Sequence, residues 1–372
     1  MVRNIYISGT EQHSGKTLIS VGLVASLKKR GYRVGYMKPV GQRTVEMGDS
    51  VVDEDVALIN TTYGIDTHPK ACNPVTIPHG FTRSFLAEGR SNRDLVRQIR
   101  EGYERVVGKD GDAADIVVIE GTGHAGVGSV IGLCNATVAR LLNARTLVIV
   151  GGGIGRPVDQ FTINRALFNQ EGVDVLGVVA NKVYDKGRDS VCSALSTYFG
   201  NHDVPLYGVL PYRRMLTEIT LQQILDETDA EVLNGHEQLH QRIQHCIVGA
   251  GEPHRLISEF RSGVLAIMPG DRDDLVLAAL GSHQLKEDVS LGTSVCLTEG
   301  LTPPDNIMDL VCASKMPMIA LDDDTFEVTS RISSLVAKIQ PTDAEKLHLA
   351  EQLVEEYVDI DALVENILGD EA

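Results

Sequence analysis

Residues 8–20 form the segment of this chain best suited to chemistry, and they read SGTEQHSGKTLIS. A glycine-rich turn that leads into a helix points main-chain N–H groups and the positive end of the helix dipole at an anion. A lysine there reaches the outer phosphates, and the next hydroxyl suits Mg²⁺. We therefore expect a phosphate-binding loop with Lys16 as a catalytic residue and Thr17 as a metal ligand. The residues expected to bind nucleotide are Gly9, Thr10, His13, Ser14, Gly15, Lys16, Thr17 and Leu18.

The spacing of this loop departs from the usual GxxxxGK[ST] pattern. The upstream glycine is Gly9, and Thr10 stands where the pattern has a glycine. An ordinary turn followed by a helix start is therefore an alternative interpretation. The apolar run at residues 5–7 and the apolar helical pattern after the loop favour phosphate binding.

Three acidic side chains could complete a metal site. Glu120 directly follows the apolar run 116–119, so its carboxylate either caps the next turn or is a hard oxygen ligand for Mg²⁺. A phosphate-binding loop nearby favours the ligand. Asp53 and Asp55 lie in VDEDVALI and could add a carboxylate, directly or through water. The same acidic cluster could simply begin a helix, and both interpretations stay open.

Two further polar residues end apolar runs. Lys38 precedes Pro39, and a lysine at that position could neutralise a substrate carboxylate or a phosphoryl group during transfer. Alone, it could equally be a solvated rim residue. Asn181 follows the run 177–180, where its amide could recognise a purine ring or stabilise a turn. We predict a catalytic role for Lys38 and a nucleotide-binding role for Asn181.

These residues need a scaffold that brings strand ends together. Short β-branched runs alternate with helix-length segments over the first 212 residues. Such alternation predicts a parallel sheet with helices on both faces and ligands at the carboxyl ends of its strands. The expected fold class is α/β, of the P-loop NTPase type. The predicted strands are residues 5–8, 34–38, 116–119, 146–150, 175–180 and 205–210.

The rest of the chain predicts a second, smaller α/β domain. Apolar runs at residues 246–248, 264–268, 295–298 and 318–321 alternate with helical segments. Residues 344–365 repeat apolar side chains at helical spacing against acidic neighbours. We expect three regions: a nucleotide-binding domain at 1–212, a second domain at 213–340 and a helical tail at 341–372.

Composition limits the classes of partner. The chain of 372 residues has 43% hydrophobic and 23% charged residues and a net charge of −17, which argues against nucleic acid or an anionic membrane as the main partner. Six dispersed cysteines favour buried, reduced thiols over disulfides. We expect a cytoplasmic protein without a signal peptide or membrane span. The cysteines are Cys72, Cys134, Cys192, Cys246, Cys296 and Cys312.

Residues 1–212 resemble dethiobiotin synthetase and its relatives. The shared segments, in order, are GTEQHSGKT, YMKPVG, DEDVAL, NPVT, VIEGTGH, GVVANKV and PLYGVLP. The resemblance implies a P-loop α/β fold that uses ATP and Mg²⁺. It implies that Lys38 contacts a substrate carbamate, that Thr17, Asp55 and Glu120 hold Mg²⁺, that Lys16 binds the phosphates, and that Asn181 binds adenine. The loop is unlike that of partition ATPases, which carry an early signature lysine.

The chain also departs from that family on the substrate side. Gly41, Gln42 and Arg43 follow the KPV segment, where these synthetases commonly have a serine. The glycine-rich segment after Glu120 contains His124, and His13 lies in the phosphate loop. We therefore do not expect dethiobiotin as the product.

The second half resembles the DRTGG domain, a module usually regarded as regulatory or ligand-sensing. The matching segments are PGDRDD, LTEGLTP and DDDTFEVTSRI. The two domains in this order resemble the N-terminal part of long phosphotransacetylases. We expect no catalytic acetyltransferase domain in these residues, so acetyl transfer is not predicted. Dimeric relatives of the first domain imply a homo-oligomer.

Two functions are consistent with these residues. One is a protein that binds Mg-ATP and regulates a partner enzyme, or responds to a small-molecule ligand, through its DRTGG-like domain. The alternative is an ATP-dependent ligase that phosphorylates a small carboxylate or carbamate. An intact Gly15-Lys16-Thr17 favours nucleotide chemistry, whereas the altered substrate segments favour regulation.

Overall fold

The computed structural model describes residues 2–108, 113–284 and 293–369, which form two compact units. The first unit combines Met1–Arg213 with Ile339–Ala372, and the second is Arg214–Lys338. The second unit is therefore inserted between two parts of the first. From the sequence we predict a separate helical tail at residues 341–372, whereas the structure places that segment in the first unit.

A six-stranded sheet organises the first unit, and every neighbouring pair of its strands is parallel. The strands are buried and apolar along most of their length, as expected for a parallel sheet covered on both faces. The predicted P-loop-type α/β fold is confirmed. In spatial order the strands are β10 (Leu206–Pro211), β9 (Val175–Val183), β8 (Arg145–Val150), β1 (Arg3–Gly9), β7 (Ile116–His124) and β2 (Val34–Met37).

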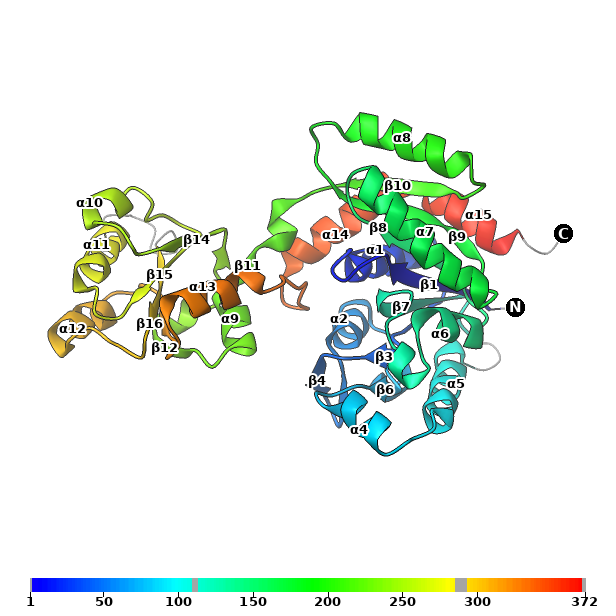
Figure 1. The fold of residues 1–372 in the computed structure, drawn as a ribbon, viewed down its shortest axis with the longest axis horizontal. Helices are drawn as coiled ribbons and strands as arrows, with labels where there is room; N and C mark the ends of the chain where they lie inside the picture. Colours follow the sequence, from blue (N-terminus) through cyan, green and yellow to red (C-terminus); the bar gives the residue numbers. More distant parts are fainter. Residues whose placement is uncertain (1, 109–112, 285–292, 370–372) are drawn as a thin grey trace. The chain divides into compact units, whose positions relative to one another are not determined.

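Helices cover both faces of this sheet (Figure 1). Helix α1 (Lys16–Lys29) follows β1 and leads to β2, while the later connections run the opposite way across the sheet. Since parallel crossovers are right-handed, those later helices lie on the face opposite α1. They are α5 (Arg93–Val107), α6 (Asn135–Leu141), α7 (Gly155–Gln170) and α8 (Arg188–Gly200).

The C-terminal helices complete the face that α1 begins. Helix α14 (Ala344–Tyr357) contacts α1 and β10, and α15 (Ile360–Leu368) contacts β10. Helices α1 and α14 approach so closely that a Cβ on Gly22 would lie 2.3 Å from Cβ of Val354. At the rim of this contact, Arg30 Nη1 lies 2.9 Å from a Glu355 oxygen.

Short elements connect β2 to β7, and of these the sequence indicated only a helix start at the acidic cluster of residues 53–55. Strands β3 (Val40–Gly41) and β6 (Val75–Thr76) pair in parallel, and β4 (Thr44–Met47) and β5 (Ser50–Asp53) form a hairpin. Gly48, with φ of +63°, makes the hairpin turn at low conformational cost. The short helices here are α2 (Glu54–Tyr63), α3 (Pro69–Cys72) and α4 (Phe81–Ala87), and the 3₁₀ helix η2 (Ser129–Ile131) follows β7.

The second unit is a smaller α/β sandwich. In its five-stranded sheet, β12 (Glu231–Asn234) is antiparallel and the other strands are parallel. Spatial order is β12, β17 (Met318–Ala320), β16 (Ser294–Thr298), β15 (Val264–Pro269) and β14 (His245–Val248). The remaining elements are η3 (Arg214–Thr217), β11 (Ile219–Thr220), α9 (Leu221–Glu227), η4 (His236–Gln238), β13 (Arg242–Ile243), α10 (Pro253–Leu256), α11 (Asp273–Gln284), α12 (Asp305–Ala313) and α13 (Thr325–Ser334).

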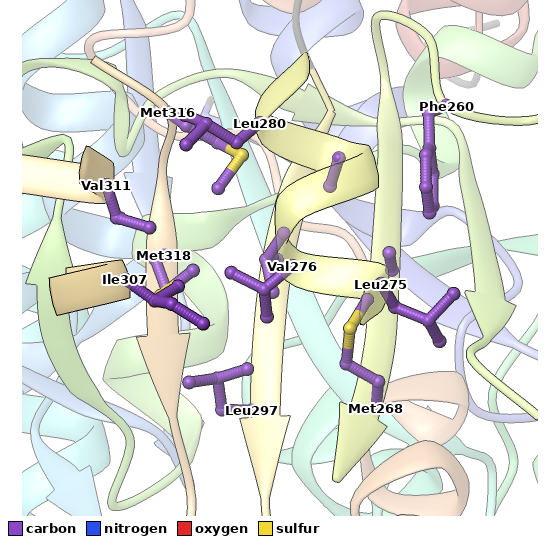
Figure 2. Close-up of a cluster of buried hydrophobic side chains, with 13 residues drawn as sticks. Phe260, Met268, Leu275, Val276, Leu280, Leu297, Ile307, Val311, Met316 and Met318 are labelled. Carbon is purple, nitrogen blue, oxygen red and sulfur yellow. The ribbon is translucent and has the colours of Figure 1, made fainter. Parts of the chain in front are cut away.

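Alternating side chains divide the core of this unit into two clusters. Along β15, Ala266 and Met268 point to one face, where α11 and α12 pack (Figure 2). Leu265 and Ile267 point to the other face, where α9 and α13 pack. This period of two is the pattern of a strand buried on both faces.

All six cysteines lie in the described part of the chain, and none forms a disulfide. Cys72, Cys134 and Cys296 are buried as predicted, but the prediction of burial is wrong for the other three, which lie on exposed faces of helices or edge strands. These are Cys192, Cys246 and Cys312. Among the described helices, none has the length and apolar character needed to cross a membrane.

Candidate functional site

The turn between β1 and α1 needs two glycines. Gly15 immediately precedes α1 with φ of +100°, and a Cβ there would lie 2.0 Å from Nδ2 of Asn181. A Cβ on Gly9 would lie 2.2 Å from Oγ of Ser14. Any side chain at either position would therefore displace the loop, whereas Thr10, at the position where the usual motif has glycine, is accommodated and buried.

The start of α1 presents unpaired amides. Its first intrahelical bond runs from Ile19 N to Gly15 O at 3.1 Å, and within the described chain the amides of residues 14–18 donate to no main-chain carbonyl. Helix N-termini leave such donors for side chains, water or an anion. Burial lowers the pKa of Lys16 while the charge of Glu120 works in the opposite direction. The turn therefore gathers N–H donors and an ammonium at one point.

Three oxygen-bearing side chains meet at the second residue of this helix. The Thr17 hydroxyl lies 2.9 Å from Oε1 of Glu120 and 3.1 Å from Oδ1 of Asp55. Glu120 comes from β7, which pairs with β1, and Asp55 comes from the first turn of α2. Parallel pairing aligns Ile7 with Glu120, so the carboxylate lies beside the end of β1. Residues far apart in the sequence thus form one group of hard oxygen donors.

The environment of Glu120 favours its protonated form. Burial, and then the charge of Asp55, raise the pKa of Glu120 to about 7. Its second oxygen, Oε2, accepts a hydrogen bond of 2.9 Å from the hydroxyl of Tyr36. Burial followed by the nearby carboxylate raises the pKa of that phenol, so Tyr36 remains a donor. A cation placed among these oxygens would stabilise ionised Glu120.

Lys38 lies immediately after β2 and binds two aspartates. Its Nζ is 2.7 Å from Oδ1 of Asp53 and also pairs with Oδ2 of Asp55. Burial disfavours the ammonium, but the two carboxylates outweigh burial and raise its pKa. For Asp55 burial is again the opposing effect, and Lys38 holds the pKa of this carboxyl below its usual value. Lys38 is therefore a buried cation rather than a solvated rim residue.

Asp53 and Asp55 have different surroundings. Asp53 is the N-cap of α2: its side chain accepts from Asp55 N at 3.1 Å, and also from Gln42 N at 2.9 Å. The helix-start interpretation thus describes Asp53, whereas Asp55 reaches Thr17. Asn73, fully buried, accepts from Asp53 N at 2.9 Å and donates to Lys38 O at 2.8 Å. It holds the two segments together.

Asn181 lies under the phosphate loop. Its Nδ2 donates to Ser14 O at 2.9 Å, and its Oδ1 accepts from Lys182 N at 2.8 Å. The neighbouring Lys182 donates from Nζ to His13 O at 2.7 Å. These bonds place the carboxyl end of β9 against the loop. Both ends of the Asn181 amide are bonded to main chain here, and its contact with adenine stays a prediction.

Two predicted site residues do not lie at strand ends. Strand β7 continues past Glu120 to His124, and β9 continues past Asn181 to Val183. The polar residue at which the apolar run stops is therefore inside the strand, where its side chain is 1% exposed for Glu120 and 3% for Asn181. Sequence reasoning assigned no role to Tyr36, Asn73 or Lys182.

A small hollow with a cavity volume of about 60 Å³ is lined by residues that follow Lys38 and Glu120 closely in the chain. Val40, Ile77 and Ile131 give it apolar walls, and Gln42 and Thr122 add polar groups. The hollow is held in shape because Thr122 Oγ1 donates to Val40 O at 2.6 Å.

The arrangement suits phosphate and a hard divalent cation. Mg²⁺ in nucleotide sites takes one or two carboxylates, a Ser or Thr hydroxyl and phosphate oxygens. Thr17, Asp55 and Glu120 provide this donor set, so the residues fit the ion. The fold and site together define a P-loop nucleotide-binding protein of the α/β class.

Comparison with known families agrees with this class. A family model described as AAA domain (AAA_26) matches residues 3–220, and a model described as DRTGG domain matches residues 223–335. The first match covers more than half of the chain, so the chain belongs to this AAA domain family. The resemblance to a dethiobiotin-synthetase-like P-loop domain fused to a DRTGG domain is confirmed.

Similar curated proteins are phosphate acetyltransferases. The protein from Nitratidesulfovibrio vulgaris is 26% identical over an alignment 382 positions long, which covers 99% of this chain and 52% of that protein. The one from Synechocystis is 25% identical, covering 98% and 52%, and the one from Pseudomonas aeruginosa is 25% identical, covering 97% and 52%. The chain spans about half the length of the curated relatives it matches.

One solved structure that is similar in part is a MinC:MinD cell division protein complex from Aquifex aeolicus. The likeness has a TM-score of 0.35 at 11% identity and covers 58% of this chain and 84% of that chain.

Proposed function

We propose that this chain binds Mg-ATP and uses it to regulate a partner enzyme or to sense a ligand through its DRTGG domain. The observation that carries the nucleotide proposal is the convergence of Asp55 and Glu120 on the Thr17 hydroxyl, at the start of a helix with unpaired amides. A phosphate chain bound there would meet N–H donors, an ammonium and a metal together.

Each residue has a distinct part in this proposal. The loop residues Gly9 to Leu18 supply N–H donors, and Lys16 contacts the outer phosphates. Thr17, Asp55 and Glu120 hold Mg²⁺, whose bound charge would neutralise the phosphates. Lys38, released from Asp55 when that carboxylate binds the ion, would then be available to a phosphoryl oxygen. The part of the site that would bind the phosphates and Mg²⁺ is thus assembled from the loop after β1, the start of α1, β7 and α2.

The regulatory part rests on the DRTGG domain match and on the names of the relatives. Their matched portion is about half of a phosphate acetyltransferase, so an enzyme of that activity is the partner to test first. We further propose a homo-oligomer in the cytoplasm. Six unpaired cysteines suit a reducing compartment.

Calorimetry tests nucleotide binding. We expect ATP to bind with Mg²⁺ present. Removal of Mg²⁺ or a Thr17→Ala substitution should weaken binding by about tenfold or more, which is a loss of about 1.4 kcal/mol of binding free energy. Lys16→Ala should have a similar or larger effect. Arg97→Ala, on the exposed face of α5, is a matched control that should bind as the unaltered chain does. The absence of heat with ATP at millimolar concentration would disprove the proposal.

A second function, phosphorylation of a small carboxylate or carbamate, is favoured by the hollow that begins two residues after Lys38. Lys38 would orient the acceptor and the apolar walls would hold its carbon chain. Release of ADP that depends on an added carboxylate or diamino acid, and that Lys38→Ala abolishes, would establish this activity. ATP binding without such turnover would leave the regulatory proposal as the better one.

A further inference from the structure

The two oxygens of Glu120 have different partners. Strand β7, which carries Glu120, lies between β1 and β2 in the sheet. Oε1 lies 2.9 Å from the hydroxyl of Thr17, in the first turn of the helix that follows β1. Oε2 accepts a hydrogen bond of 2.9 Å from the hydroxyl of Tyr36, in β2. One oxygen is therefore directed at the phosphate loop, and the other is bonded to the strand on the opposite side of β7.

The pairing of β2 with β7 fixes the position of Tyr36. Tyr36 pairs with Val118, and Glu120 follows two residues later, so the three side chains point to the same face of the sheet. Both Tyr36 and Glu120 are buried. A ring in a close-packed interior cannot swing away without leaving a void. The Tyr36 hydroxyl therefore stays on Oε2.

Divalent cations differ in how they use a carboxylate. Mg²⁺ requires nearly octahedral geometry with metal–oxygen distances of about 2.0–2.1 Å, whereas Ca²⁺ takes about six to eight oxygens at longer distances and can bind both oxygens of one carboxylate. With Oε2 bonded to Tyr36, Glu120 presents a single oxygen, which suits Mg²⁺. A cation that took both oxygens would displace the Tyr36 O–H, and a buried donor without a partner is costly.

We propose that Tyr36 is a positioning residue that makes the nucleotide site select Mg²⁺ over Ca²⁺. By holding Oε2, its hydroxyl leaves Glu120 with one oxygen for the cation, so Tyr36 acts through Glu120 rather than on the cation itself. The inference rests on the proposed nucleotide binding and adds the residue that determines the choice of metal.

Calorimetry of ATP in Mg²⁺, in Ca²⁺ and in EDTA tests this role. The unaltered chain should bind ATP more tightly with Mg²⁺ than with Ca²⁺. Tyr36→Phe removes only the hydroxyl and should weaken binding in Mg²⁺ roughly tenfold, because the partners that orient metal ligands typically contribute about 10–100-fold to metal affinity. Binding in Ca²⁺ and in EDTA should stay unchanged. A folding defect would instead weaken binding under all three conditions.

Tyr6→Phe is the matched control. Tyr6 lies in β1, on the other side of β7, and is also buried; its hydroxyl donates to Oδ1 of Asn135 at 2.9 Å. Its loss should leave the preference for Mg²⁺ unchanged. In a chain that already carries Glu120→Gln, Tyr36→Phe should change this preference no further, since the two residues act as one unit.

An unchanged preference for Mg²⁺ in Tyr36→Phe would overturn this inference and leave the proposed nucleotide binding intact. So would equal losses under the three conditions, effects of Tyr36→Phe and Glu120→Gln that simply add, or an unaltered chain that binds ATP equally well with the two cations. If the unaltered chain bound ATP under none of the conditions, the proposed function itself would fail, and this inference with it.

Discussion

The Thr17 hydroxyl carries one hydrogen and lies within hydrogen-bond distance of two carboxyl groups. It can donate to only one of them, so the second contact requires a proton on a carboxyl. Glu120, with its pKa raised to about 7, is the group that holds this proton, because Lys38 keeps Asp55 ionised. Below about pH 7, the oxygens that we propose as metal ligands therefore share a proton.

This proton predicts a pH dependence of stability without nucleotide or metal. A carboxyl has an ordinary pKa near 4.5, and the pKa of Glu120 in the folded chain is about 7. Between these values the folded state binds more protons than the unfolded state, so Glu120 contributes stability that is complete below about pH 4.5 and lost as pH rises to about 7. Thermal melting from pH 5 to 8 measures this loss.

Glu120→Gln is the comparison for the melting experiment. The amide keeps the shape of the side chain and does not titrate. The melting temperature of the unaltered chain should therefore fall relative to that of the variant as pH rises. A difference that stays constant from pH 5 to 8 would contradict the raised pKa of Glu120.

Asn73 gives a second prediction at the residue scale. Asn73→Ala would leave the buried Asp53 N–H and Lys38 carbonyl without a partner, at about 1–3 kcal/mol for each group. We expect the free energy of unfolding of the first unit to fall by about 2 kcal/mol or more in urea denaturation. Asn92→Ala, which removes an exposed bond to Gly132 O, is the control. A change in Asn73→Ala no larger than in this control would refute the bridging role.

At the level of single residues, the sequence predicted the side chains but not their partners. Lys16, Thr17, Asp55 and Glu120 could be selected from their types and spacing. That Tyr36 donates to Glu120 could not, because the contact joins residues 84 positions apart and depends on the register of β2 and β7.

At the scale of elements, the contact of α1 with α14 predicts whether an alanine at Gly22 stabilises or destabilises the first unit. An alanine inside a helix is usually about 1 kcal/mol better than glycine, yet at Gly22 its Cβ would lie 2.3 Å from Val354. Overpacking costs about 1–3 kcal/mol, so we expect Gly22→Ala to destabilise the first unit in thermal melting.

Gly200→Ala is the matched substitution in the same unit. Gly200 lies in α8, and a Cβ there would meet no atom within 4 Å. It should therefore be neutral or slightly stabilising. If both alanines raised the melting temperature, the close approach of α1 and α14 would be wrong.

Long elements were predictable and short ones were not. The six main strands of the first unit follow from runs of β-branched residues, since such runs have few other stable arrangements. Strands of two residues, such as β3 and β6, carry no periodic pattern and exist because their neighbours hold them. The hairpin at Gly48 has a turn signal in Gly48-Asp49.

At the scale of the whole molecule, the inserted position of the second unit was not predictable from pattern alone. The amphipathic residues 344–365 showed that a helix needed an apolar partner but did not identify it. The structure supplies α1 and β10 as that partner. The chain therefore leaves the first unit after Arg213 and returns at Ile339.

This connectivity predicts that nucleotide binding affects the second unit if the chain is regulatory. Coupling between sites is reciprocal, so a ligand-sensing unit must respond to ATP. Hydrogen exchange of β16 and β17 should change on addition of Mg-ATP, and a flexible insertion after Lys338 should reduce that change while leaving exchange in the phosphate loop responsive. Unaltered exchange throughout the second unit would argue against regulation.

The return of the chain also determines how the two halves can be separated. A fragment that stops at residue 213 loses α14 and α15, so the apolar surface of α1 and β10 that these helices cover would become exposed to solvent. We expect such a fragment to aggregate when expressed. A fragment that keeps residues 339–369, joined to residue 213 by a short flexible peptide, should instead fold as a shortened but complete nucleotide-binding half.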